Sequence, residues 1–218
     1  MPCCRGQDYD QMFDAKTAKK QLRRYEKRGA EGQTKNLLNS LKKALKSAGS
    51  DEFTHLDIGG GVGVLQHELQ ASGATRTTAV DASAPYLSLL CAAAKERGYE
   101  GNQICVEGDF TAVAPELEQS TVVTLDKVIC CYPDMPGLVR ASAKKATLFY
   151  GIVLPRDTAI FRAGAKAVNW FVRHLLRWKF QAFVHSQMEI DQLIEDEGLR
   201  LVDEVPGFVM CVRVYQRG

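Results

Sequence analysis

The sequence predicts an α/β fold, in which helices cover a mostly parallel sheet within a single domain of residues 1–218. Five apolar, strand-like runs alternate with helix-like stretches, which is the pattern of right-handed βαβ units. A glycine-rich break follows the first run, within residues 54–65 (THLDIGGGVGVL). The end of the chain has two more strand-like runs around a Pro-Gly turn, which predicts an antiparallel hairpin. The five central strands are expected at 53–58, 77–80, 103–106, 122–130 and 146–154.

The composition is that of a soluble globular protein, with 45% apolar and 25% charged residues. A chain of 218 residues buries most of its apolar surface in one domain. No run approaches the ~20 apolar residues that a membrane-spanning helix needs. The first ten residues (MPCCRGQDYD) lack the basic start and apolar core of a signal peptide, so we expect a cytoplasmic location.

The seven cysteines predict neither a disulfide framework nor a zinc site. Their number is odd, none forms a C-x-x-C motif, and no histidines cluster. We expect most of them to be small core residues, and we expect no metal cofactor. They are Cys3, Cys4, Cys91, Cys105, Cys130, Cys131 and Cys211.

Charge is unevenly distributed, although the net charge is only +2. Residues 1–49 carry twelve Lys/Arg against five Asp/Glu, a net of +7, and residues 156–180 carry six against one, a net of +5. Residues 187–204 have the opposite balance, one against seven, a net of −6. The basic segments are suited to an anionic substrate, nucleic acid or a membrane surface, and the alternative is that they are solvated helix faces.

Two helices are expected before the first strand, and they form a helical N-terminal cap over residues 1–49. Residues 14–28 are rich in Lys, Arg, Ala and Gln without an internal Gly or Pro. Residues 34–48 carry leucines at spacings of three to four, which gives one apolar stripe. The core of the domain then extends over residues 50–218. The stripe consists of Leu37, Leu38, Leu41 and Leu45.

The glycine-rich break has the form D-x-G-x-G-x-G. Glycine has no Cβ and tolerates positive φ, so such a turn after a strand lets the backbone approach a ligand closely. A nicotinamide-binding turn has the form G-x-G-x-x-G, which would require glycine at Val64, so that class becomes a distant alternative. The motif residues are Asp57, Gly59, Gly61 and Gly63.

Two further acidic residues follow the next two strands. Asp81 comes after Val80, 24 residues beyond Asp57, and Asp109 stands between Gly108 and Phe110 after the third strand. Ligands of parallel sheets bind beyond the carboxyl ends of the strands, where these residues converge. The alternative is that the glycines mark an ordinary turn and the acids end solvated strands.

In their order and spacing, these three elements resemble the class I S-adenosylmethionine (SAM) methyltransferases. The resemblance implies a Rossmann-like sheet whose glycine turn wraps the methionine half of SAM. It also implies that Asp81 accepts hydrogen bonds from the ribose hydroxyls and that Asp109 and Phe110 lie beside the adenine. The cofactor-binding residues implied are Asp57, Gly59, Gly60, Gly61, Gly63, Asp81, Ala82, Gly108, Asp109, Phe110 and Lys127.

An amphipathic, basic helix with two tryptophans, Trp170 and Trp178, is expected after strand five at 158–180, within a lid-like segment of residues 156–180. Three interpretations stay open: a surface helix over the sheet, a lid on a large apolar anionic substrate, or a helix on a membrane surface. The hairpin that follows is expected at 199–205 and 208–215.

Three segments carry a closer resemblance that extends from Met12 to the C-terminus. They are the helix sequence LRRY (22–25), the strand-four sequence DKVICCYP (126–133) and FVH (183–185) before a helix at 189–197. They resemble the magnesium protoporphyrin O-methyltransferases and their unassigned bacterial relatives. Cys131 replaces the usual His, and Arg28-Gly29 replaces Tyr-Gly. The resemblance therefore implies the cofactor site and the pocket location, but not a porphyrin substrate.

The candidate catalytic residues are Tyr132, His185 and Cys131. Each also has a structural interpretation: a pocket wall or orienting group for Tyr132, a packed ring for His185 and a packed thiol for Cys131. His67 is expected to be solvated. A carboxylate or thiolate acceptor would need no base, whereas an alcohol, phenol or ammonium would. The expected substrate pocket consists of Tyr9, Phe13, Arg24, Tyr25 and Tyr132.

We therefore expect an enzyme that transfers a methyl group from SAM to a small or mid-sized acceptor, yielding S-adenosylhomocysteine (SAH). One hypothesis for the acceptor is an anionic amphipathic molecule held between the two basic segments. The alternatives are a nucleic-acid methyltransferase and a SAM-binding protein without turnover. Strand four ends in Cys-Cys-Tyr-Pro-Asp rather than an Asn/Asp-Pro-Pro-Tyr motif, which argues against nucleic acid. Weak contact with a membrane surface stays open, as does the oligomeric state.

Overall fold

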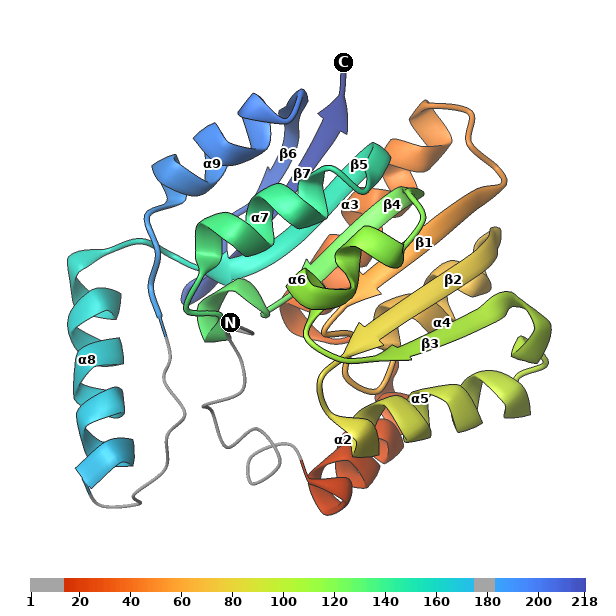
Figure 1. Ribbon diagram of the computed structural model, residues 1–218, viewed down its shortest axis with the longest axis horizontal. Helices are drawn as coiled ribbons and strands as arrows, with labels where there is room; N and C mark the ends of the chain where they lie inside the picture. The colour runs from red at the N-terminus through yellow and green to blue at the C-terminus, as the bar shows by residue number, and fades with distance from the viewer. Residues whose placement is uncertain (1–13, 175–182) are drawn as a thin grey trace.

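The computed structural model describes residues 14–174 and 183–218, and it contains one seven-stranded sheet (Figure 1). The strand order is β3-β2-β1-β4-β5-β7-β6. Strands β1 to β5 are parallel, and β7 is antiparallel to both β5 and β6. The expected α/β fold with a C-terminal antiparallel pair is confirmed. The strands are β1 (Phe53–Ile58), β2 (Ala74–Asp81), β3 (Gln103–Glu107), β4 (Ser120–Asp126), β5 (Ala146–Pro155), β6 (Leu199–Val205) and β7 (Met210–Arg217).

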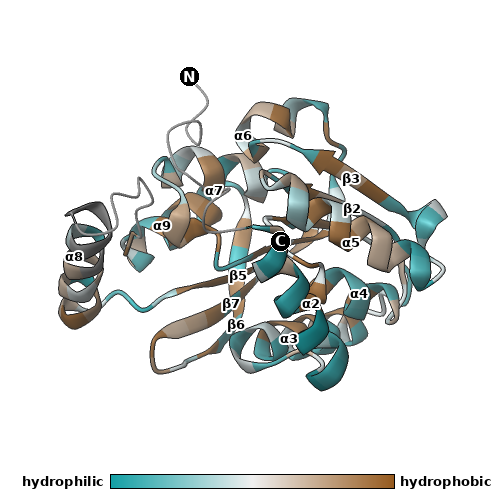
Figure 2. Cartoon of the chain, turned by 90° about the horizontal axis from the view of Figure 1, so that it is seen from below, coloured by the Kyte–Doolittle hydropathy of each residue, from teal (hydrophilic) through white to brown (hydrophobic). Residues whose placement is uncertain are grey.

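Helices cover both faces of this sheet (Figures 1 and 2). On one face α3, α4 and α5 pack against the strands, with α2 outside α5, and on the other face lie α6, α7 and α9. None of the described helices is long and apolar enough to cross a membrane. The helices are α2 (Ala15–Arg28), α3 (Gly32–Ser47), α4 (Val64–Gln70), α5 (Ala84–Glu96), α6 (Phe110–Val113), α7 (Met135–Ala143), α8 (Ala159–His174) and α9 (Gln187–Asp196).

The leucine stripe of α3 is buried against β5 and β7, as the periodicity indicates. Gly151 lies under this stripe in the middle of β5. A Cβ there would lie 2.8 Å from Leu37 Cδ1 and 3.4 Å from Leu41 Cδ1, which is too close for ordinary packing. The glycine therefore lets the cap helix approach the sheet, and this contact fixes the cap next to the strand ends.

Strand β4 ends four residues earlier than the apolar pattern predicts. Lys127 has a φ of 65°, in the left-handed region, so the chain leaves the sheet directly after Asp126. The apolar residues that follow form a short 3₁₀ turn, Ile129–Cys131, instead of more strand. The turn carries Cys131 to the edge of the sheet where the strands end.

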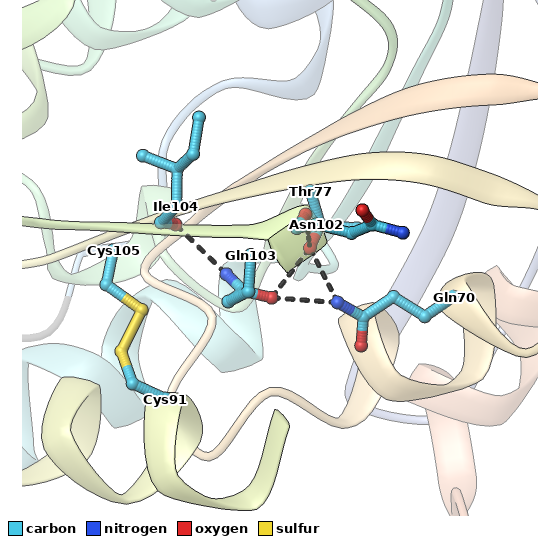
Figure 3. Close-up of a disulfide and its surroundings, with 7 residues drawn as sticks. All are labelled: Gln70, Thr77, Cys91, Asn102, Gln103, Ile104 and Cys105. Carbon is cyan, nitrogen blue, oxygen red and sulfur yellow. Dashed lines mark hydrogen bonds between the residues drawn. A yellow bond between two sulfur atoms is a disulfide. The ribbon is translucent and has the colours of Figure 1, made fainter. Parts of the chain in front are cut away.

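Two cysteines form a disulfide that the sequence analysis does not predict. Cys91 on α5 is bonded to Cys105 on β3, 14 residues further along the chain (Figure 3). Cys211 is buried, whereas Cys130 and Cys131 are half-buried. The expectation that most cysteines are small core residues is therefore wrong for the described part of the chain. Cys3 and Cys4 lie outside the described residues.

Candidate functional site

A cavity of about 380 Å³ lies at the carboxyl ends of β1, β2 and β4. Pockets for small ligands and cofactors have volumes of about 300–1,000 Å³. Its lining includes twelve of the predicted site residues: Asp57, Gly59, Gly60, Gly61, Asp81, Ala82, Gly108, Asp109, Phe110, Lys127, Cys131 and Tyr132. It also includes polar residues that the sequence analysis misses: Gln21, Thr34, Ser83, Tyr86 and Asp126.

The first glycines of the turn are required by packing within the protein. A Cβ at Gly59 would lie 2.6 Å from Val128 Cγ2, and a Cβ at Gly60 would lie 2.3 Å from Asp57 Oδ2. Both distances are too short for real side chains, and Gly59 also has a positive φ of 64°. These two glycines therefore shape the turn, and a ligand is not needed to explain them.

Gly61 and Gly63 differ in what surrounds them. A Cβ at Gly63 would lie 2.8 Å from Leu90 Cγ, and Gly63 does not line the cavity, so its role is packing. A Cβ at Gly61 would meet no atom closer than Tyr86 Cδ1, at 3.7 Å. Both Gly61 and Tyr86 line the cavity. The absent side chain of Gly61 thus leaves space that a ligand can fill.

The buried side chain of Asp57 packs against the glycine turn. Its side chain is fully buried, and Oδ1 accepts a hydrogen bond of 2.6 Å from the Thr124 hydroxyl, which is itself 2.8 Å from His55 Nε2. Oδ2 has no hydrogen-bond partner and lies against Gly60. Burial raises the pKa of the Asp57 carboxyl to about 7, and the Thr124 hydrogen bond opposes that rise. The carboxyl group is therefore poised between its protonated and ionised forms near neutral pH.

Asp81 links the glycine turn to the turn that begins α5. Its Oδ2 accepts a hydrogen bond from the Gly61 amide at 3.1 Å, and its Oδ1 accepts one from the Ser83 amide at 2.8 Å. Burial raises the pKa of this carboxyl, while the two amide hydrogen bonds lower it. Each carboxylate oxygen can accept more than one hydrogen bond, so Asp81 still has acceptor capacity toward the cavity.

Asp109 is held by its own helix and by Tyr132. Its Oδ1 accepts hydrogen bonds from the Thr111 amide, at 3.1 Å, and from the Tyr132 hydroxyl, at 2.6 Å. Phe110 follows it as a buried residue of the cavity wall. This geometry favours the orienting interpretation of Tyr132, since its hydroxyl positions Asp109.

A polar cluster joins the cap helix α3 to the end of β4. The Lys127 amine donates to Asp126 Oδ1 and to the Thr34 hydroxyl, both at 2.8 Å. The Thr34 hydroxyl donates to Asp126 Oδ2 at 2.5 Å. Lys127 is the one non-glycine residue with positive φ in the described ranges, and such backbone often occurs at functional sites. The cluster places one cation and one carboxylate at the cavity wall.

The Cys131 thiol lies 3.7 Å from the thiol of Cys130. The hydrogen bond with Cys130 and burial raise the pKa of Cys131, so this thiol stays protonated at neutral pH. The geometry favours packing over nucleophilic attack. Over residues 14–174 and 183–218, no group of three His, Cys, Asp or Glu side chains is arranged to hold a metal ion.

The two histidines of the sequence analysis lie outside the cavity lining. His185 donates from Nε2 to the Tyr132 carbonyl oxygen at 3.2 Å, and its ring stacks on Phe183. Burial lowers its pKa. This placement favours the structural interpretation of His185. His67 is buried against Tyr25, so the expectation that it is solvated is wrong.

The expected substrate residues of the cap also lie away from the cavity. The Tyr25 ring is buried on His67, and its hydroxyl donates to Glu68 at 3.3 Å. Arg24 is exposed and pairs with Glu31 at 2.6 Å. Neither lines the cavity, which Gln21 and Thr34 of the cap line instead. Tyr9 and Phe13 lie outside the described residues.

In the described part of the two basic segments, helices α2 and α8 do not face each other. In Figures 1 and 2, α8 stands at one end of the molecule and α2 packs beside α5 at another. The idea of an anionic acceptor clamped between these helices therefore has no support from their placement.

Solved structures share this fold. Magnesium protoporphyrin IX methyltransferase from Synechocystis PCC 6803, crystallised with SAH, has a TM-score of 0.68 at 17% identity, over 97% of this chain and 98% of that chain. The chain has the class I methyltransferase fold. No protein-family model matches the sequence, and no curated protein matches it.

Other proteins with the methyltransferase fold differ in their accepting atom. Geranyl diphosphate C-methyltransferase from Streptomyces coelicolor A3(2) has a TM-score of 0.64 at 12% identity, over 83% of this chain and 78% of that chain. The N-methyltransferase NodS from Bradyrhizobium japonicum WM9 has a TM-score of 0.59 at 14% identity, over 84% and 86%. Because the same fold serves carbon and nitrogen acceptors, it does not identify the acceptor of this chain.

Proposed function

We propose that this protein is a SAM-dependent methyltransferase acting on a small or mid-sized acceptor. The observation that carries the proposal is the open space at Gly61, beside Asp81, at the strand ends of a methyltransferase fold. Gly59, Gly60 and Gly63 are explained by packing, whereas Gly61 combines a positive φ of 59° with open space on the cavity side, where a ligand fits.

The residues of the cavity fit the parts of SAM. The backbone at Gly61 would pack against the methionine part, and the acceptor capacity of Asp81 suits the ribose hydroxyls. Asp109, held by Tyr132, and the buried ring of Phe110 suit the adenine. When bound, SAM supplies an electrophilic methyl group on its sulfonium. The task of the protein is then to align the acceptor and to exclude water.

The polar cluster of Thr34, Asp126 and Lys127 is the group that we assign to the acceptor. No histidine belongs to the described cavity lining. Of its four carboxylates, Asp81 and Asp109 are assigned to SAM and Asp57 is fully buried, which leaves Asp126 to remove a proton. Its two oxygens already accept hydrogen bonds from Thr34 and Lys127. An acceptor that needs no deprotonation, such as a carboxylate, fits this site best, with Lys127 as its cation.

A SAM-binding protein without turnover is the second candidate, because the described cavity lining contains no histidine. Two measurements separate the enzyme from the binding protein. Calorimetric titration with SAM and SAH measures binding. An assay then measures the SAH that is formed from SAM in the presence of carboxylic, phenolic or thiol acceptors. Binding with SAH formation supports the enzyme. Binding without SAH formation from any acceptor class supports the second candidate.

The sharpest test of the cofactor site is the pair of variants Gly61→Asn and Gly49→Asn. Both glycines have similar positive φ values, 59° and 65°, and asparagine tolerates this region better than most residues. A Cβ at Gly49 would meet nothing within 4 Å, and Gly49 does not line the cavity. We expect Gly61→Asn to weaken SAH binding at least ~10-fold, equivalent to about 1.4 kcal/mol.

Gly49→Asn should bind SAH like the wild type, with a comparable change in melting temperature. Equal affinities for the two variants would remove the assignment of the cavity to SAM.

A further inference from the structure

Large apolar side chains are exposed where α8, α9 and the β6–β7 hairpin meet. The exposed fractions are 86% for Phe208, 80% for Ile160 and Met188, and 47% for Val209. Single exposed apolar residues are common on proteins, but a group of them marks an interaction surface. We call these four residues the apolar corner.

Contacts between α8, α9 and the hairpin bring the members of the apolar corner together. The ring of Phe161, next to Ile160, packs edge-on against Phe208 with centroids 6.2 Å apart. The Arg156 amide donates to the Val209 carbonyl oxygen at 2.9 Å. On α9, Gln187 precedes Met188 and its side chain donates to the carbonyl oxygen of Pro155 at 3.5 Å. Figure 2 shows apolar residues at the start of α8 and along the nearby hairpin.

The apolar corner lies at the same edge of the sheet as the cavity. Pro155 ends β5 and pairs with Met210, which begins β7, so the hairpin tip extends beyond the carboxyl end of β5. The cavity lies at the carboxyl ends of the parallel neighbours of this strand. The apolar corner and the cavity therefore lie on the same side of the molecule, so a partner that binds the apolar corner is on the cavity side.

Positive charge adjoins the apolar corner. The described residues 156–174 carry four Lys/Arg against one Asp, a net charge of +3, and Arg156 is exposed at the start of this segment. The exposed Trp170 extends the apolar character along α8. Basic helices with Trp and aliphatic residues bind at the interface of membranes with anionic lipids. Residues 187–204, on α9 and β6, have a net charge of −6, so the positive charge lies on the α8 side of the apolar corner.

We propose that the apolar corner and the basic start of α8 dock on the surface of an anionic lipid membrane. The side chains of Phe208, Ile160, Met188 and Val209 enter the headgroup region, and Arg156 lies at the level of the lipid phosphates. This inference does not depend on the proposed methyltransferase activity, since vesicle binding is measured without SAM or an acceptor.

The test is sedimentation of the full chain with phosphatidylcholine vesicles, with and without roughly one-third phosphatidylserine. We expect binding to the anionic vesicles that weakens as salt rises, and little binding to the neutral ones. Phe208→Ser should weaken binding about tenfold and Arg156→Gln about fivefold. The matched controls are Ile104→Ser on β3, where the side chain is 45% exposed, and Arg200→Gln at the far end of β6.

Both controls should bind like the wild type, because they lie far from the hairpin tip in the sheet. The proposal is overturned if the wild type does not sediment with anionic vesicles, or if Ile104→Ser weakens binding as much as Phe208→Ser. Light scattering tests the alternative that a second copy of the chain binds at the apolar corner. A dimer that Phe208→Ser dissociates, without vesicle binding, would assign the apolar corner to a second copy.

Discussion

At the scale of single residues, the buried carboxyl of Asp57 links the glycine turn to pH. Its folded-state pKa, about 7, lies above the ordinary value of 3.8 because burial disfavours the ionised form. Between these pH values the folded state holds a proton that the unfolded state releases. The contribution of Asp57 to stability is therefore fully present below pH 3.8 and is lost as pH rises through about 7.

The variant Asp57→Asn tests this linkage, because the amide does not titrate and keeps the shape of the carboxyl group. We expect its free energy of unfolding, relative to that of the wild type, to increase from pH 5 to about 7 and to level off above. Urea unfolding between roughly pH 5 and 8.5 measures the difference. Asp51→Asn, in the exposed loop before β1, is the control. A difference for Asp57→Asn that is independent of pH would mean that Asp57 is ionised throughout.

Residue types and their spacing predicted that the glycine turn follows β1 and that Asp81 ends β2, because both depend on local sequence. They did not predict Thr34, whose partner Asp126 is 92 residues away and becomes a neighbour only when α3 packs on β5. His67 is buried for a similar reason, since the Tyr25 ring on another helix covers it. A polar residue on a cap helix carries no signal in the sequence that tells which side chain it will meet.

At the scale of elements, the predicted strand end that was wrong is one that backbone conformation decides. The strand predicted at 122–130 is apolar along most of its length, but the left-handed conformation of Lys127 ends it at Asp126. The disulfide between α5 and β3 was likewise not predictable, because counting cysteines gives no pairing. The strands β1, β3 and β5 matched within one residue, since their apolar runs have clear polar or glycine borders.

The disulfide predicts an effect of reductant on stability. A closed loop of about 15 residues lowers the entropy of the unfolded chain enough to stabilise the fold by ~3 kcal/mol. For a protein of this size, reduction should therefore lower the melting temperature by on the order of 5–10 °C. The double variant Cys91→Ser/Cys105→Ser should melt at one temperature with or without reductant. Mass spectrometry of alkylated peptides checks the bond itself, and free thiols at both positions in the oxidised protein would contradict it.

At the scale of the whole molecule, one edge of the sheet carries both the cavity and the apolar corner, but different strands build them. The cavity lies at the ends of β1, β2 and β4, and the apolar corner lies beyond β5 and β7. This separation follows from strand order, because the antiparallel pair β7 and β6 extends the sheet beyond β5, away from β1 and β2. A ligand in the cavity and a membrane at the apolar corner can therefore bind at the same time.

Hydrogen exchange measured by mass spectrometry separates the two surfaces, because amide protection reports local opening. We expect SAH to slow exchange in residues 57–63 and 81–86, where the Gly61 amide is held by Asp81, and to leave residues 206–209 unchanged. Anionic vesicles should slow exchange at the start of α8 and at residues 206–209 instead. In Gly61→Asn the response to SAH should disappear while the response to vesicles persists. If SAH protected the hairpin tip as strongly as the glycine turn, the two surfaces would be coupled rather than independent.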